Sequence, residues 1–320
     1  MPKPAAWPAS RRSIIAVAAN PKARILAEAL PYIRAYHGKL LVIRLGGNAM
    51  TDGALMAGFA RDVALLRLVG MKPVILHGGG WRIDELARAL GIQTRRHQGF
   101  RVTDERTLTV VEMALAELNQ ELTGLINRHG GRAVGLDGQD GRFIHARRMS
   151  LPAAGDGQAP DLGFVGDIES IDVDIVLLLL SRGFIPVIMP IGVGADGAAY
   201  HINSDLLAGR LARALRAEKL ILMTNAPGIR DRSGKLVYVL KARDAEALLR
   251  DGAVDESMRP RLVAALEAVR EDVRSVHIID GGVPNALLLE VLTAQGVGTA
   301  LRSDAGPDFL EDSRDFLLAE

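Results

Sequence analysis

Leu41-Val-Ile-Arg-Leu-Gly-Gly-Asn48 joins a short apolar run to a pair of glycines, and Pro73-Val-Ile-Leu-His-Gly-Gly-Gly80 repeats this arrangement further along the chain. In both places the residues that follow carry apolar side chains at helical spacing. The sequence therefore predicts a strand at Leu40–Leu45 and another at Pro73–Leu76, each leading through a glycine turn into a helix. Strands and helices that alternate in this way are typical of parallel α/β architecture.

Periodic segments extend this pattern along the rest of the chain. Predicted helices lie at Ala23–His37, around Phe59 to Leu66, at Arg82–Leu90, from a cap at Thr103 to about Asn127, and at Asp174–Arg182, Ser204–Leu215, Asp244–Arg250 and Arg261–Val269; further strands lie at Ile185–Met189, Leu220–Met223 and Val276–Ile279. Asp-Gly pairs predict one hairpin in Gly135–Ser150, turning at Asp140-Gly141, and a second that turns at Asp196-Gly197. Leu151–Gly163 has the composition of a surface loop. We expect one continuous, mainly parallel sheet.

Composition narrows the class of protein. The chain has 320 residues, of which 48% are hydrophobic and 4% aromatic, so Ala, Leu, Val and Ile must build the core. A formal net charge of +1 argues against a nucleic-acid-binding face, which would be strongly basic. The chain lacks cysteine, which excludes disulfides and thiolate metal sites and fits a cytoplasmic protein. No apolar stretch approaches the roughly 18 residues of a membrane span, and the residues after Arg11-Arg12 do not form a convincing export signal.

Glycine turns between strands and helices suit phosphate binding. Glycine lets the backbone approach an anion closely, and amides at a helix N-terminus attract it. Such turns lie at the carboxyl edge of a parallel sheet, where ligands bind. The alternative is that Gly46-Gly47 and Gly78–Gly80 only form tight turns. The Gly192–Gly197 segment matches a dinucleotide-binding pattern in letters, but a strand-like segment follows it. No Gly-x-Ser-x-Gly element supports a hydrolase, and the seven histidines lack metal-ligand spacing.

Eight motifs in order resemble the N-acetylglutamate kinases, which belong to the amino-acid kinase family. The resemblance covers about residues 24 to 301 and rests on Gly46-Gly-Asn-Ala-Met50, Phe59-Ala-Arg-Asp62, His77-Gly-Gly-Gly80, Gly99-Phe-Arg-Val-Thr-Asp104, Val134-Gly-Leu136, Gly163-Phe-Val-Gly166, Pro186–Gly194 and Asn203-Ser-Asp205. It implies a three-layer αβα sandwich. It also implies transfer of the γ-phosphoryl group of ATP, with Mg²⁺ held mainly by the nucleotide, to the side-chain carboxylate of N-acetyl-L-glutamate in arginine biosynthesis.

The resemblance also implies roles for particular residues. The predicted catalytic residues are Arg44, Asp205 and Arg261, with Asp205 between the two cations. The predicted substrate-binding residues are Gly78, Gly79, Arg101 and Asn203; the predicted nucleotide-binding residues are Gly46, Gly47, Asn225 and Gly228. Arg101 would grip the α-carboxylate of the substrate. Arg101 could instead be a solvated surface residue, and Asn203 and Asp205 could simply cap a helix.

Departures from the family pattern leave the activity open. Arg44 and Arg261 stand where the family has lysines, and Asn225 stands where it has aspartate. Arginine keeps the charge but is larger, planar and forked. Three hypotheses follow: an acetylglutamate kinase of reduced activity, a pseudokinase that binds acetylglutamate or arginine as a regulatory subunit, and a kinase for another acyl amino acid whose pocket is reshaped by Trp81.

The family resemblance further suggests regulation and assembly. Lys219, Glu290, Gly296 and Gly298 match the surroundings of an arginine inhibitor in allosteric members, although Asn285 replaces a common histidine. The helix at residues 23–38 resembles the one that links dimers into hexamers, so a dimer-based homo-oligomer is expected; the alternative is that it packs on its own subunit. We divide the chain into a leader (1–22), this helix, an amino-acid lobe (39–195), a nucleotide lobe (196–301) and an acidic tail (302–320).

Overall fold

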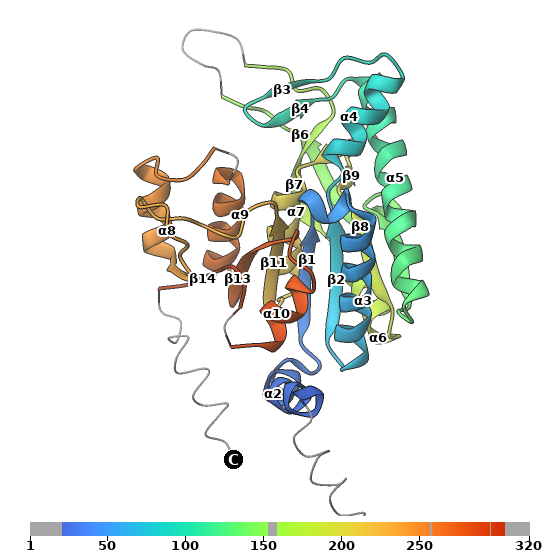
Figure 1. The fold of residues 1–320 in the computed structure, drawn as a ribbon. Coiled ribbons are helices and arrows are strands. Elements are labelled where there is room, and N and C mark those ends of the chain that lie inside the picture. Colours follow the sequence, from blue (N-terminus) through green and yellow to red (C-terminus); the bar gives the residue numbers. More distant parts are fainter. Residues whose placement is uncertain (1–20, 153–158, 257, 295, 305–320) are drawn as a thin grey trace, which may run out of the picture.

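The computed structural model describes residues 21–152, 159–256, 258–294 and 296–304 (Figure 1). Eight strands form the central sheet: β1 (Leu40–Leu45), β2 (Lys72–His77), β5 (Ala133–Asp137), β8 (Ile185–Met189), β11 (Lys219–Thr224), β12 (Val239–Lys241), β13 (Ser275–Asp280) and β14 (Thr299–Arg302). Their order is β12-β14-β13-β11-β1-β2-β8-β5, and only the β13–β14 pair is antiparallel. The predicted α/β fold with a mainly parallel sheet is confirmed.

Helices cover both faces of this sheet. Apart from α2 (Pro21–Tyr36), which lies beyond one end of the sheet, the helices are α3 (Gly53–Leu68), α4 (Gly80–Ala89), α5 (Glu105–Arg128), α6 (Asp174–Ser181), α7 (Ser204–Ala214), α8 (Ala242–Arg250), α9 (Arg259–Arg270) and α10 (Ala286–Leu292). Side chains alternate along β1, as the period of a strand requires. Leu41 and Ile43 pack in the layer of α3, α5 and α10, whereas Val42 packs in the layer of α7 and α9. Arg44 therefore points toward α7.

A small closed barrel accompanies the sheet. It consists of β6 (Ile144–Arg148), β7 (Val165–Ile171), β9 (Ile191–Val193) and β10 (Ala199–Ile202), and a separate hairpin joins β3 (Arg95–His97) to β4 (Phe100–Val102). Two short 3-10 turns, η1 (Gly47–Met50) and η2 (Asp140–Arg142), follow β1 and β5. In Figure 1 the β3–β4 hairpin lies at the top of the molecule and α2 at the bottom, beyond the opposite end of the sheet.

Two local predictions were wrong. Gly135–Ser150 is not a hairpin, because β5 pairs with β8 in the central sheet while β6 pairs with β7 and β9 in the barrel. The Asp140-Gly141 turn is real, with Gly141 at φ +59°, but it carries the chain from one sheet to the other. The cap of α5 is Asp104, whose side chain accepts a hydrogen bond from the Thr107 amide. Thr103 instead donates its hydroxyl to the carbonyl of Arg101.

The position of β10 concerns the predicted boundary between the two lobes, after residue 195. This strand lies after residue 195 but pairs with β7 and β9, so the chain leaves the barrel after Ile202. The leader up to residue 20 and the tail from residue 305 lie outside the described residues. None of the described helices is long and apolar enough to cross a membrane.

Candidate functional site

The two glycine turns lie side by side and face one cavity. β1 and β2 are parallel neighbours with Leu45 opposite His77, so both turns leave the sheet at the same edge. The Gly78 amide donates a hydrogen bond of 2.9 Å to the Leu45 carbonyl. Both turns line a cavity of about 420 Å³. The pairing of β1 with β2 therefore brings the two glycine turns together, as the sequence predicted.

Arg44 lies beneath both turns. Its side chain is buried at 7% exposure, and Nη2 donates to the Ser204 hydroxyl at 2.9 Å while Nη1 donates to the Met223 carbonyl at 3.3 Å. A Cβ at Gly46 would lie 1.7 Å from Arg44 Nη1, so the glycine makes room for the guanidinium. The arginine at this position is therefore held by defined partners.

Asp205 joins the two catalytic cations that the sequence predicted. Its Oδ1 lies 2.9 Å from Nε of Arg44, and its Oδ2 lies 3.7 Å from Nε of Arg261. Asp205 is in the first turn of α7, and Arg261 comes from α9, which packs against α7. Burial lowers the pKa of Arg44, Asp205 opposes that shift, and the charge of Arg261 adds to it. The arrangement concentrates positive charge, balanced by one carboxylate, on the cavity wall.

Asn225 holds the first glycine turn. It follows β11, and its Oδ1 accepts a hydrogen bond of 2.5 Å from the Asn48 amide. Gly47 has φ +69°, and a Cβ there would lie 1.9 Å from the same oxygen. An aspartate would offer the same acceptor, so replacement by asparagine preserves this contact and removes a negative charge.

The backbone amides of the turns divide into two groups. The Gly78 amide is engaged by Leu45, which corrects the expectation that it is offered to a ligand. In the described part of the chain, the amides of Gly46, Gly47 and Gly79 have no hydrogen-bond partner. The first amides of α4, beginning at Gly80, are also open, because a helix leaves its initial N–H groups unsatisfied. These donors suit an anion in the cavity.

Arg101 lines the same cavity and is not a solvated surface residue. It is 4% exposed, Nη1 contacts Asp84, and Nη2 donates to the Gly80 carbonyl at 3.1 Å. Asp84 also pairs with Arg96 at 3.1 Å. The carboxylate holds both arginines at the cavity, where their remaining N–H groups suit an anionic substrate.

Two titratable lining residues were missed from sequence. Arg96 on β3 and His201 on β10 face the same cavity as Arg101. Burial, with the charges of Arg101 and Arg96, lowers the pKa of His201 to about 4, so the imidazole is neutral at physiological pH. The alternation along β10, where Tyr200 and Ile202 are in the core, was the signal that could have placed His201 on the other face.

Asn203 and Trp81 complete the cavity wall. The Asn203 side-chain oxygen caps α7 by accepting from the amides of Asp205 and Leu206, at 2.9 and 3.2 Å. Its helix-capping role is therefore realised, and only the Nδ2 group is left for a substrate. Trp81, on the first turn of α4, is 39% exposed and lines the cavity.

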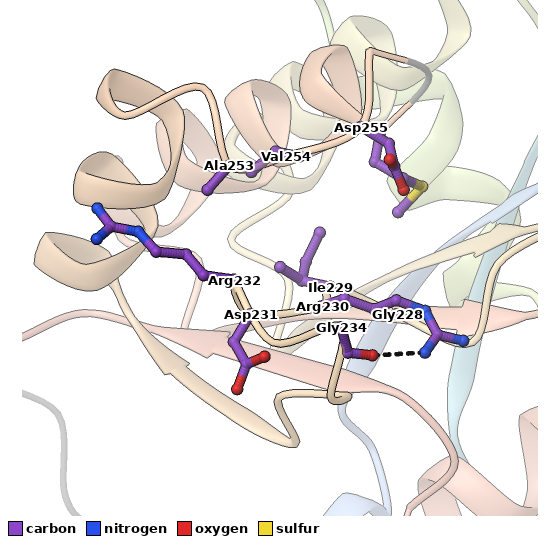
Figure 2. Close-up of a pocket in the computed structure, with 10 residues that line it drawn as sticks. Gly228, Ile229, Arg230, Asp231, Arg232, Gly234, Ala253, Val254 and Asp255 are labelled. Carbon is purple, nitrogen blue, oxygen red and sulfur yellow. Dashed lines mark hydrogen bonds between the residues drawn. The ribbon is translucent and has the colours of Figure 1, made fainter.

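A second cavity of about 350 Å³ lies next to the first (Figure 2). Gly228, with φ +143°, and Met258 line it, and Met258 Sδ lies 3.8 Å from Nη1 of Arg261 in the larger cavity. Figure 2 shows Arg230 on one side of this cavity, where it donates a hydrogen bond to the Gly234 carbonyl. The segment from Ala253 to Asp255 lines the other side. Gly228 is thus separated from the glycine turns and belongs to an adjoining compartment.

A third cavity of about 280 Å³ contains three of the four predicted effector residues, namely Lys219, Glu290 and Gly296. His277 donates from Nδ1 to Glu290 at 2.5 Å, and its Nε2 lies 3.0 Å from Lys219 Nζ. Burial lowers the pKa of Lys219 to about 8, although the Glu290 charge opposes the shift.

Gly298 is the fourth predicted effector residue. It packs against the backbone of β13, where a Cβ would lie 2.1 Å from the Ile278 carbonyl. No cluster of three or more metal-binding side chains occurs among the described residues.

Comparison with known proteins gives consistent matches. The profile of the amino acid kinase family matches residues 39–280. The acetylglutamate kinase of Chromobacterium violaceum is 56% identical over 290 residues, which cover 90% of this chain and 100% of that protein.

Two solved structures show the same fold. The N-acetylglutamate synthase of Neisseria gonorrhoeae, in complex with coenzyme A and N-acetyl-glutamate, has a TM-score of 0.80 and 27% identity over 89% of this chain. A second structure of that synthase, with coenzyme A and L-arginine, has a TM-score of 0.75 and 26% identity over 88% of this chain. The match spans 64% and 66% of the two synthase chains.

Proposed function

The chain belongs to the amino acid kinase family, and we propose that it transfers the γ-phosphoryl group of ATP to the side-chain carboxylate of N-acetyl-L-glutamate, a step of arginine biosynthesis. The observation that carries this proposal is the pair of glycine turns at one cavity. A hydrogen bond from the Gly78 amide to the Leu45 carbonyl connects the two turns, and Arg44, Asp205 and Arg261 lie beside them. Phosphoryl transfer between two anions requires positioned positive charge and hydrogen-bond donors. The backbone amides and the two arginines, held by Asp205, supply these around one cavity.

The residues divide the work between the two substrates. Arg101 would hold the α-carboxylate, and the amides of Gly47 and Gly79 would face the reacting carboxylate and phosphoryl oxygens. An oxygen of the acceptor carboxylate forms a bond to the γ-phosphorus, and the bond to the bridging oxygen of ADP breaks. Arg44 and Arg261 would neutralise the charge on the phosphoryl group during this exchange. No proton transfer by the protein is required.

The adjoining cavity around Gly228 would receive the rest of the nucleotide. It opens beside Arg261, which places a cation between the two compartments. The donor set fits a triphosphate, because it consists of amides and guanidinium groups. Mg²⁺ would arrive with the nucleotide and supply charge neutralisation at the phosphates.

The arginine substitutions favour catalysis of reduced rate over a pseudokinase. Arg44 and Asp205 form a buried ion pair, and the guanidinium also donates hydrogen bonds to the Ser204 hydroxyl and the Met223 carbonyl. The guanidinium is therefore accommodated, and its charge lies beside the turns. Compared with relatives whose sites are built around lysine ammonium groups, these fixed planar guanidinium groups should give slower turnover, although the partners of Arg44 in this chain fit a guanidinium.

A second function, arginine binding, is supported by the third cavity. Glu290 would face the guanidinium of an effector and Lys219 its carboxylate. Tyr36 of α2 lies over Lys219, with 4.9 Å between Nζ and the ring centroid, so α2 borders this cavity. Ile25 and Leu26 on the same helix are 61% and 70% exposed, which supports a homo-oligomer, such as a hexamer, built through α2.

A coupled assay of ADP release tests the proposal. Release should require both ATP and N-acetyl-L-glutamate and should be absent with L-glutamate alone. Acetylglutamate binding without any release would instead establish the pseudokinase.

A further inference from the structure

His77 is a buried histidine that the proposed chemistry does not use. It is the last residue of β2 and is fully shielded from solvent. Ile75, two residues earlier, packs in the layer of α3 and α5, and His77 faces the same side. Its imidazole therefore lies behind the second glycine turn, between the sheet and α5, and not in the cavity.

The hydrogen bonds of His77 determine which nitrogen carries the proton. Nδ1 lies 2.8 Å from the Gly78 carbonyl, which can only accept, so Nδ1 is the donor. Nε2 lies 3.1 Å from Nδ2 of Asn119, and the same Nδ2 donates to the Val187 carbonyl at 2.9 Å. Because that carbonyl also only accepts, the Asn119 amide cannot be turned around, and Nε2 of His77 must accept. Burial, to which the charge of Arg44 adds, lowers the pKa of His77 to about 4 and keeps the ring neutral.

These bonds fix the peptide group between Gly78 and Gly79. The N–H of Gly78 is held by Leu45 and its carbonyl by His77. In a trans peptide the carbonyl of one residue and the N–H of the next point in opposite directions. The Gly79 N–H therefore points away from His77, and Gly79 lines the cavity. A Cβ at Gly79 would lie 2.7 Å from Leu115, so only glycine brings the backbone this close to α5.

We propose that His77, oriented by Asn119, is a positioning residue that keeps the N–H of Gly79, and not the carbonyl of Gly78, directed at the acceptor carboxylate and the phosphoryl group. This inference rests on the proposed function. Were the peptide to flip, the carbonyl oxygen would face an anion and the open amide would face the core. The loss would fall on the reacting centre, since Arg101 lies on β4 and is also held by Asp84, and the nucleotide cavity is lined by other elements.

Two substitutions of matched polarity test the proposal. In His77→Asn the side-chain amide can occupy the place of Nδ1 and still donate to the Gly78 carbonyl. In His77→Gln the amide occupies the place of Nε2 and cannot. We expect kcat to fall by about 10²-fold or more in His77→Gln, the effect of losing one positioned donor, and to stay within about tenfold of the wild type in His77→Asn. KM for ATP should change little in both.

Equal kcat in the two variants would overturn the proposal, because a purely structural histidine would not distinguish them. If His77→Gln does not fold, the ¹⁵N NMR spectrum of the wild-type protein, labelled at histidine, tests the proposal instead. That spectrum should show a neutral ring protonated at Nδ1 between about pH 6 and 8, and a ring protonated at Nε2 would refute the inference. The tautomer does not depend on turnover. A wild-type protein with no kinase activity but an Nδ1–H ring would therefore refute the proposed function and leave the positioning intact.

Discussion

The Nε of Arg44 lies 2.9 Å from the Oδ1 of Asp205, and this buried pair connects the end of β1 to the start of α7. The same carboxylate reaches Arg261 from α9. Asp205 thus sets the separation of two cations that would otherwise repel each other. Because each comes from a different element, the charge on the cavity wall depends on the packing of the sheet against α7 and α9.

Arg44→Lys should lower kcat by about tenfold, and not restore a faster enzyme. A lysine ammonium cannot contact Asp205, Ser204 and the Met223 carbonyl together as the guanidinium does. Asp205→Asn should cost more, about 10²-fold, because it leaves the buried Arg44 and the partly buried Arg261 without their carboxylate. Steady-state kinetics with ATP and acetylglutamate measure both. If the Arg44→Lys, Arg261→Lys double variant instead turns over much faster than an inert wild type, the pseudokinase hypothesis is correct.

The sequence predicted the mainly parallel α/β fold, but it did not predict every strand pairing within it. The glycine turns carry a local signal, whereas Arg44, Asp205, Arg261 and Arg101 were indicated by the family resemblance; the structure gathers all four side chains at one cavity. Pairing partners carry no local signal. An Asp-Gly turn marks a reversal of the chain, but it does not say whether the strands on its two sides belong to the same sheet, and β5 and β6 do not.

Short or polar elements were also missed from sequence. The strand β3 consists of Arg95, Arg96 and His97, all exposed, and it shows no apolar alternation. Its position depends on pairing with β4 and on the Arg96–Asp84 contact, which are tertiary interactions. The hydrogen bond of the Gly78 amide, at the site itself, was likewise not predictable from sequence. Glycine composition predicts a turn, but the register of β1 against β2 decides which amide bonds within the protein and which amides stay open to a ligand.

Trp81 should influence which acyl group is accepted. It is an exposed side chain on the cavity wall, and it follows Gly80, whose carbonyl accepts a hydrogen bond from Arg101. A substrate whose α-carboxylate lies at Arg101 would carry its acylated nitrogen toward this wall. Trp81→Ala should raise KM for N-acetyl-L-glutamate about tenfold, through lost apolar contact, and should change kcat less. The ratio of kcat/KM for N-acetyl and N-propionyl glutamate, compared with that of Leu90→Ala on the exposed end of the same helix, measures the effect. An unchanged ratio in Trp81→Ala would show that the indole does not contact the acyl group.

Arginine affinity should depend on the charge of Lys219. Because burial lowers the pKa of Lys219 to about 8, its ammonium form is lost as the pH rises through that value. If this ammonium holds the effector carboxylate, arginine binding should be constant below about pH 7. Above about pH 8 it should weaken by up to about tenfold per pH unit. Calorimetric titration with L-arginine measures the affinity. Lys219→Met should bind more weakly and lack this dependence, and a variant with the same pH profile as the wild type would exclude Lys219 as the titrating group.

Asp62 should make the protein less stable at neutral pH than at mildly acidic pH. It lies on α3 at 2% exposure, and its Oδ1 has no hydrogen-bond partner among the residues that the structure describes. Burial raises its pKa to about 7 against the opposing effects of Arg61 and the Leu288 amide. Between about pH 4 and 7 the folded state therefore binds a proton that the unfolded chain has released, so this group's contribution to stability falls as the pH rises and is constant above 7. Asp62→Asn removes the ionisation and keeps an acceptor for Leu288. Its stability advantage over the wild type, measured by denaturant unfolding, should grow by about 3 kcal/mol from pH 5 to pH 8. An advantage that is the same at both values would mean that Asp62 is already ionised in the folded protein.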